Sequence, residues 1–257
     1  MEINTPAGHR PRVGASLDTQ GGESYLVDLA GALQRFDGQF GWDADFPRDM
    51  IELLRAGPDA LQVAAAAQDV ARQIFEKASA AEFEAAGLAY KRRAVRVLAP
   101  ITRPGKVIAI GANYEAHIQE GRNTGALDGN LPPYPPAFLK MSTAVVGTDE
   151  PVVFPYFGSE LDYEVEFSIV IGTACQNVAE EDWLSVVAGF TIVNDLGLRD
   201  VILQEKEDGL VLAGKNFATA CPMGPYLVTK DEIPAPQDSA CACASMESCG
   251  RTTAPAT

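Results

Sequence analysis

The chain has 257 residues, 47% of them hydrophobic, and a formal net charge of −15 at pH 7. This length and composition allow a full hydrophobic core, in one large domain or in one large and one small domain. The negative charge argues against a nucleic-acid partner, because phosphate binding depends on clustered Lys and Arg side chains. No apolar stretch reaches the roughly 18 residues of a membrane span. The first residues lack a secretory h-region, so we expect a cytoplasmic protein with no membrane partner.

Residues 1–100 are predicted to form a small accessory N-terminal domain of mixed α and β structure. The sequence from about 12 to 27 predicts a pair of strands. Apolar residues at helical spacing predict helices over 49–56 and 58–78. Two prolines and a glycine between residues 99 and 105 mark the expected boundary. Nothing in this domain indicates chemistry.

From residue 106 the sequence changes to short runs of β-forming residues that are separated by Gly and Pro. These runs are 106–111, 137–147, 151–155, 163–172 and 190–195. Helical pattern is confined to 114–120 and about 179–187. The pattern predicts an α+β fold that is mainly β. It contains no GxGxxG motif and no P-loop, so a dinucleotide or nucleoside triphosphate site has no support.

The most informative segment is the predicted strand over residues 161–172. Alternate side chains of a strand point to opposite faces, so one face is apolar and is predicted to be buried: Leu161, Tyr163, Val165, Phe167, Ile169 and Ile171. The other face begins with Asp162, Glu164 and Glu166. Carboxylates two residues apart lie about 7 Å from each other and repel unless water or a cation screens them. A simple solvated face and a cation site both fit this pattern.

A second apolar strand ends at Asn194 and Asp195, which favours the cation site. A carboxylate at the end of a buried strand supplies a third ligand beside Glu164 and Glu166. Three carboxylates without His or Cys favour Mg2+, with Mn2+ or Ca2+ as alternatives, over zinc. Mg2+ keeps several water-filled positions that a substrate can occupy.

Five segments, in this order along the chain, resemble the fumarylacetoacetate hydrolase (FAH) family. They are KVIAIGANYEAHIQEG, PPAFLKMSTAVVG, LDYEVEFSIVIG, VAGFTIVNDLGLRD and GKNFATACPMGPYLVT. The resemblance implies an FAH-type mixed β-roll core, a Mg2+ or Mn2+ site and a homodimer. It also implies a small-molecule substrate, an α-keto acid with a further carbonyl or enol.

The resemblance also assigns roles to single residues. The metal ligands match Glu164 and Glu166 of YEVE and Asp195 of VND. Lys215 of GKNF matches a lysine that helps bind substrate and orders the groups around the metal. The predicted catalytic residues are therefore Lys215 with His117 and Glu120, a pair on the short lid helix after the first strand.

Two further cations belong to the predicted site, and two residues in it differ from the family pattern. Arg122 and Lys140 are expected to join Lys215 in offsetting the charge of the substrate, although an ordinary solvated lysine at the end of a strand is the alternative for Lys140. Gly197 stands where NDxS-type sequences have Ser, and Asn216 stands where GKSF is more common. Both changes leave the metal ligands intact, but they can alter the groups that surround them.

The resulting hypothesis is a metal-dependent hydrolase that cleaves a carbon–carbon bond in an acylpyruvate-like or fumarylacetoacetate-like diketo acid. The cation stabilises the enolate that forms when the bond breaks, and His117, oriented by Glu120, activates water. The same site serves an isomerase or tautomerase, a hydratase, or a decarboxylase of oxaloacetate, because all share the enolate. An inactive truncated product is the non-catalytic alternative.

Residues 237–257 depart from this pattern, with three cysteines and no hydrophobic periodicity. We predict an aberrant, disordered tail without strands on an incomplete core of residues 104–236, left by truncation or by a shifted reading frame. Back-translation of residues 238–253 with G/C-rich codons gives, in a shifted frame, a strand with strict alternation, an Asn-Gly hairpin turn and a second strand. The gene sequence beyond codon 237 tests this hypothesis.

Overall fold

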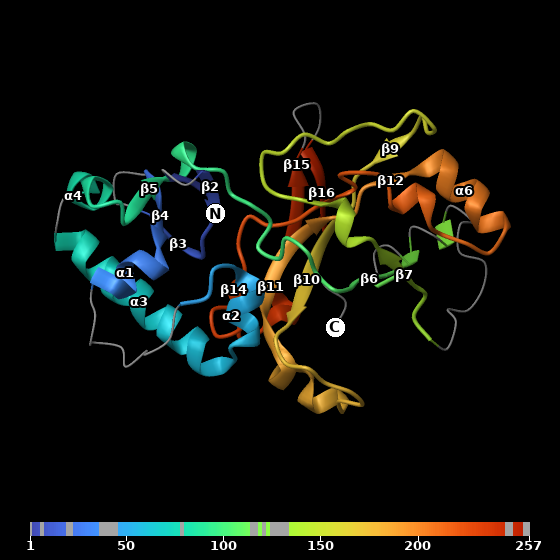
Figure 1. The fold of residues 1–257 in the computed structure, drawn as a ribbon. Coiled ribbons are helices and arrows are strands. Elements are labelled where there is room, and N and C mark those ends of the chain that lie inside the picture. The colour runs from blue at the N-terminus through green and yellow to red at the C-terminus, as the bar shows by residue number, and fades with distance from the viewer. Residues whose placement is uncertain are drawn as a thin grey trace. The chain divides into compact units, whose positions relative to one another are not determined.

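The computed structural model describes residues 2–5, 8–18, 23–35, 46–77, 80–113, 118–119, 122–123, 134–244 and 249–253. The chain divides into two compact units (Figure 1). The first consists of Met1–Ile101 with Ile171–Ala188, and the second of Thr102–Val170 with Gly189–Thr257. No helix within the described ranges is long and apolar enough to cross a membrane.

The first unit contains two small antiparallel sheets. Strands β1 (Glu2–Thr5) and β2 (Gly8–Pro11) pair with each other. Strands β3 (Gly14–Asp18), β4 (Ser24–Asp28) and β5 (Ala89–Lys91) form a sheet in the order β3-β4-β5. The predicted strand pair between residues 12 and 27 is confirmed by β3 and β4. The β1–β2 pair was not expected, because its sequence is polar and rich in turn residues.

Four helices belong to the same unit: α1 (Leu29–Arg35), α2 (Met50–Arg55), α3 (Pro58–Lys77) and α4 (Ala80–Ala85). A short 3-10 helix, η1 (Arg92–Ala94), follows β5. Helices α2 and α3 confirm the two predictions. Asp49 caps α2 by accepting a hydrogen bond from Glu52 N at 2.9 Å. One face of α3 is lined by alanines, of which Ala60 and Ala67 are fully buried, so α3 packs closely against the core.

The second unit is built from short strands and has mixed α+β structure. Strands β6 (Val107–Ile110) and β7 (Ala137–Lys140) form an antiparallel ribbon. Strand β8 (Val145–Val146), after the turn η2 (Ser142–Ala144), runs parallel to β13 (Cys221–Pro222). Strand β9 (Leu161–Asp162) pairs with β12 (Gly197–Leu198).

The central sheet has the order β10-β11-β14, made of β10 (Val165–Ile171), β11 (Val187–Asn194) and β14 (Val228–Thr229). Gly189 lies so close to β14 that an added Cβ would clash with the carbonyl oxygen of Val228. A glycine is therefore required where β11 and β14 come together. Strand β11 is largely buried and ends one residue before Asp195, as the sequence predicted.

The predicted strand over 161–172 is interrupted. Strand β9 ends at Asp162 and β10 begins at Val165, so Tyr163 and Glu164 lie in the link between them. The prediction of a fully buried apolar face is wrong, because Leu161, Tyr163, Ile169 and Ile171 are exposed. Phe167 is covered because its ring stacks on Phe190, with the centroids 5.0 Å apart. Val165 and Phe167 are half-buried, and Phe190 of β11 supplies the ring that partly covers Phe167.

Three predictions about secondary structure need correction. Residues 151–155 form no strand, because two prolines remove backbone donors and Val153 N donates to Thr219 Oγ1 at 2.8 Å. The helical segment near 179–187 is the 3-10 helix η3 (Glu180–Val186). Helix α6 (Arg199–Glu207) was missed, because its sequence is strongly polar and only Ile202 is buried.

The predicted absence of strands after residue 237 is also wrong. After the turn η5 (Pro236–Asp238), β15 (Cys241–Ala244) and β16 (Cys249–Thr253) pair antiparallel, with an irregularity between Ala242 and Ala244. The segment has no apolar alternation, so its pairing depends on main-chain hydrogen bonds that leave no mark in the sequence.

Candidate active site

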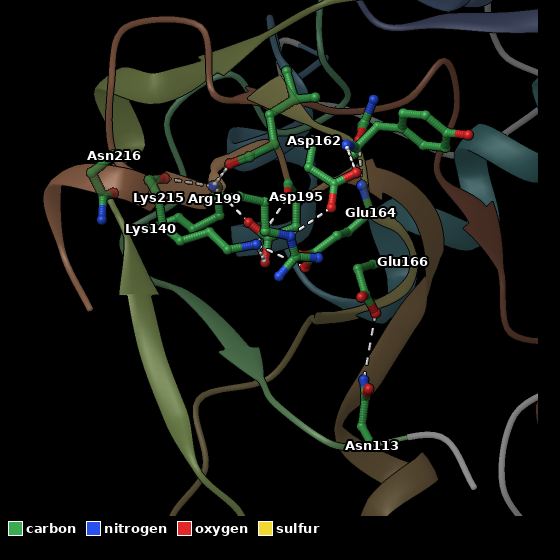
Figure 2. A network of polar contacts seen from close by, with 12 residues as sticks. Asn113, Lys140, Asp162, Glu164, Glu166, Asp195, Arg199, Lys215 and Asn216 are labelled. Carbon is green, nitrogen blue, oxygen red and sulfur yellow. Dashed lines mark hydrogen bonds and ion pairs between the residues drawn. The ribbon is translucent and has the colours of Figure 1, made fainter. Parts of the chain in front are cut away.

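Charged side chains from six segments of the second unit converge on one place (Figure 2). Three carboxylates and three cations form what we call the charged cluster: Glu164, Glu166, Asp195, Lys140, Arg199 and Lys215. Each is placed by the end of an element or by a link, except Glu166, which lies within β10. Lys140 ends β7, Asp195 follows β11, Arg199 begins α6, and Lys215 ends the turn η4 (Ala213–Lys215).

Asp195 is the most enclosed carboxylate of the cluster, with 4% of its surface exposed. Its Oδ1 lies 2.6 Å from Lys140 Nζ, and its Oδ2 lies 3.4 Å from Lys215 Nζ. Its backbone N–H donates to the carbonyl oxygen of Glu164 at 2.7 Å. This bond ties the end of β11 to the link between β9 and β10, so it fixes two carboxylate-bearing segments together.

Glu164 is held by two cations, one at each carboxylate oxygen. Lys215 Nζ lies 2.7 Å from Oε2, and Arg199 Nη2 lies 3.0 Å from Oε1. Arg199 also donates from Nε to Asp162 Oδ2 at 2.6 Å. The backbone N–H of Glu164 donates to Asn194 Oδ1 at 3.1 Å. Charge-assisted bonds of this kind are stronger than neutral ones, so Glu164 has a fixed orientation.

Glu166 differs from its two neighbours because no cation of the cluster pairs with it. Asn113 donates to its Oε2 at 3.4 Å (Figure 2). Burial, followed by the negative charges of Asp195 and Glu164, raises the pKa of Glu166 to about 7, although the Asn113 hydrogen bond lowers it. The carboxylate therefore lies in a place where negative charge is not fully compensated.

The two lysines are buried, with 3% of Lys140 and 4% of Lys215 exposed. Lys140 donates to the carbonyl oxygens of Leu196 at 3.2 Å and Lys215 at 2.6 Å, in addition to its ion pair with Asp195. The ammonium of Lys140 thus has two backbone acceptors and one ionic partner. Burial lowers the pKa of Lys140, and the Asp195 carboxylate opposes that shift.

Helix α6 positions both cations that contact Glu164. Arg199 is its first residue, and Glu205 near its end accepts hydrogen bonds from the backbone N–H groups of Leu212, Ala213 and Gly214, at 3.0, 2.6 and 3.2 Å. These bonds hold the turn that carries Lys215. An added Cβ on Gly197 would lie 2.8 Å from Ile202 Cδ1 and 3.1 Å from Lys215 Cε. The glycine therefore leaves room for the stem of Lys215.

The chemistry of the three carboxylates fits a hard divalent cation, and the raised pKa of Glu166 marks the charge that such an ion would neutralise. In the described part of the chain, however, no three His, Cys, Asp or Glu side chains are grouped closely enough to hold one ion. The reason is that Glu164 and Asp195 are directed onto Lys140, Lys215 and Arg199. To bind a divalent ion, Glu164 and Asp195 would have to direct carboxylate oxygens both to that ion and to the Lys and Arg side chains.

The structure brings together most of the residues that the sequence singled out. Lys140 pairs with Asp195, and Lys215 pairs with Glu164 and Asp195. The charges of Asp195, Glu164 and Lys215 all act on the pKa of Glu166. Arg122 is exposed, and no ion pair joins it to these carboxylates. His117 and Glu120 lie outside the described residues, so their predicted roles stay predictions.

Sequence reasoning missed four residues of the site. Arg199 and Asp162 form an ion pair, and Asn113 and Asn194 hydrogen bond to Glu166 and Glu164. Asp162 and Asn194 lie close in sequence to the predicted ligands Glu164 and Asp195, and this proximity could have marked them as residues of the site. Asp200, the residue after Arg199, accepts hydrogen bonds from the backbone N–H and the hydroxyl of Ser159.

Residues 106–248 match the family described as fumarylacetoacetate (FAA) hydrolase C-terminal. The mitochondrial oxaloacetate tautomerase Fahd2a of Rattus norvegicus is 33% identical over 243 residues, which are 95% of this chain. The chain spans 66% of the rat protein's length.

Two solved structures are similar in fold. Fumarylacetoacetate hydrolase from psychrophilic Exiguobacterium antarcticum gives a TM-score of 0.55 at 26% identity, covering 90% of this chain and 66% of that one. The 2-hydroxyhepta-2,4-diene-1,7-dioate isomerase of Mycobacterium marinum gives 0.54 at 25% identity, covering 89% and 64%.

Proposed function

Because the chain belongs to the fumarylacetoacetate hydrolase family, we propose that it is an enzyme that interconverts the keto and enol forms of a small dicarboxylic keto acid such as oxaloacetate. The observation that carries this proposal is the charged cluster, in which three carboxylates and three cations lie close together at the ends of short elements and links. The likeness to a tautomerase and to an isomerase favours enolisation over carbon–carbon cleavage. We include in the proposal the β-roll core and the homodimer that the sequence led us to expect.

The residues that would hold a divalent cation are Glu164, Glu166 and Asp195. When bound, such an ion supplies Lewis acidity at the keto oxygen of the substrate. Mg2+ is the proposed ion, because all three donors are carboxylates. Glu166 is the ligand whose negative charge has no cationic partner in the cluster.

The cations of the cluster divide into two kinds by exposure. Lys140 and Lys215 are buried and engaged with Asp195 and Glu164, so their role is to hold these carboxylates charged and oriented. The side chain of Arg199 is 41% exposed. We therefore propose that Arg199 joins the exposed Arg122 in binding a carboxylate of an anionic substrate, whereas Lys140 is buried against Asp195.

Enolisation also needs a base that removes a proton from the carbon next to the keto group and an acid that donates a proton to the keto oxygen. The residue proposed for this step is His117, with Glu120 as the group that orients it. Only a proton moves in this reaction, so the site needs no activated water. Hydrolysis of an acylpyruvate is the second candidate, favoured by the likeness to the Exiguobacterium hydrolase, and it requires His117 to activate water.

The deciding experiment follows the ultraviolet absorbance of the oxaloacetate enol after chelation and after addition of Mg2+. We expect turnover that depends on Mg2+, is lost in Glu166→Gln and survives in Glu207→Gln, which changes an exposed carboxylate at the end of α6. Turnover that survives both chelation and Glu166→Gln would overturn the proposal. Cleavage of an acylpyruvate, or release of CO2 from oxaloacetate, without tautomerisation would select the hydrolase or the decarboxylase instead.

A further inference from the structure

Asn216 follows Lys215 directly and uses every hydrogen-bonding group of its side chain on the backbone. Its Nδ2 donates to the carbonyl oxygens of Leu139 at 3.0 Å and Leu212 at 2.9 Å, and its Oδ1 accepts from Met141 N at 2.6 Å. The partners are backbone carbonyls and a backbone N–H, so the orientation of the amide is determined.

Two of these bonds flank Lys140. Leu139 and Met141 are its chain neighbours, and the amide of Asn216 binds both of them as a paired strand would. In the opposite direction, Lys140 Nζ donates to the carbonyl oxygen of Lys215 at 2.6 Å. A side chain from each of the two segments, that of Lys140 and that of Lys215 and Asn216, therefore hydrogen bonds to the backbone of the other. Figure 2 shows Asn216, Lys215 and Lys140 next to one another.

The third bond closes the turn that carries Lys215. Leu212 precedes the turn η4, and its carbonyl oxygen accepts from Asn216 Nδ2, while the backbone N–H of Asn216 donates to Ala213 at 3.3 Å. The start of the turn is held separately by Glu205. Both ends of the turn are thus fixed, and the side chain of Asn216 joins it to the backbone on both sides of Lys140, beside the bond from Lys140 Nζ to the Lys215 carbonyl.

We infer that Asn216 is a positioning residue that locks Lys140 and Lys215 together on Asp195 and so keeps the charged cluster assembled. A serine at this position would have one hydroxyl and could not make all three bonds at once. The chain thus has a link between β7 and the Lys215 turn that a serine would not supply. The importance of this link for catalysis rests on the proposed function, whereas its effect on the two lysines does not.

The test is competitive acetylation of metal-free, full-length protein with acetic anhydride, quantified at each lysine by mass spectrometry. Asn216→Ala removes all three bonds, and Asn216→Asp keeps the shape of the side chain and the acceptor for Met141 N but loses both donors. We expect labelling of Lys140 and Lys215 to rise roughly 5- to 30-fold in both variants, since the loss of one or two net hydrogen bonds changes an opening equilibrium by about that factor.

Exposed Lys106 and Lys206 serve as internal references, and Gln237→Ala, which removes an exposed amide, serves as the matched control. Labelling of these references should not change in any variant. In parallel, kcat/KM for oxaloacetate should fall roughly 10- to 100-fold in both Asn216 variants, as expected for displaced catalytic groups.

Unchanged labelling of Lys140 and Lys215 in folded Asn216→Ala and Asn216→Asp proteins would overturn the inference. Loss of the fold in both variants, seen by circular dichroism, would make Asn216 a general structural residue and would overturn it as well. If labelling increases in the variants but the wild-type protein does not turn over oxaloacetate, the positioning role of Asn216 stands and the proposed function is rejected.

Discussion

Replacement of Lys140 by methionine tests how strongly the buried ion pair with Asp195 holds the second unit together. The change keeps most of the aliphatic stem and removes the ammonium. Asp195 Oδ1 then loses a partner at 2.6 Å, and the carbonyl oxygens of Leu196 and Lys215 each lose a donor. Removal of one partner from a buried pair costs about 3–5 kcal/mol.

Two features of the structure reduce that figure. Lys215 Nζ remains 3.4 Å from Asp195 Oδ2, so the carboxylate keeps one cation. Burial also lowers the pKa of Lys140, which means that its charged form is partly disfavoured in the folded protein. We therefore expect Lys140→Met to destabilise the second unit by about 2–3 kcal/mol, or roughly 5–10 °C in Tm.

A double-mutant cycle with Asp195→Asn, measured by urea unfolding, isolates the interaction. The double variant removes both charges, so its cost should be smaller than the sum of the two single costs by roughly 2 kcal/mol. Additivity to within about 0.5 kcal/mol would refute the reasoning. Arg72→Met, which breaks the exposed pair between Arg72 and Asp69, is the matched control and should cost less than about 1 kcal/mol.

Three other changes test separate parts of the structure. Burial raises the pKa of Asp28 above its ordinary value of 3.8, so the folded protein binds more protons there than the unfolded chain, and its stability falls as pH rises above 3.8. Asp28→Asn should therefore make the free energy of unfolding in urea depend less on pH. An unchanged dependence on pH in this variant would contradict the prediction. Glu166→Gln should make the metal-free protein more stable to unfolding above pH 7, because the variant no longer places a charged carboxylate in a site that raises its pKa to about 7. The same variant should no longer bind Mn2+ in calorimetry. Retained Mn2+ binding would exclude Glu166 as a ligand. Gly189→Ala should lower stability by about 3 kcal/mol, since its Cβ meets the Val228 carbonyl and a backbone cannot move aside; a Tm within about 2 °C of wild type would contradict that close approach.

Much of the candidate site was readable from the sequence because its carboxylates lie where local patterns change. Glu164 and Glu166 lie on the polar side of an alternating run, and Asp195 follows an apolar run, so these local patterns marked them as candidates. The resemblance to the FAH family then assigned them as metal ligands. The helices α2 and α3 were predicted for a similar reason, since apolar spacing and the Asp49 cap are local signals. The sequence by itself therefore determined the features that show in the periodicity of a single strand or helix.

The tertiary structure alone decided which cation meets which carboxylate. Lys140 and Asp195, or Lys215 and Glu164, are separated by more than fifty positions, and each ion pair depends on how β7, β11 and η4 are packed. The break between β9 and β10, which places Glu164 in a link, and the polar helix α6, which presents Arg199, have no periodic signature. These features arise from contacts between distant segments, and such contacts depend on the whole fold rather than on any local run of residues.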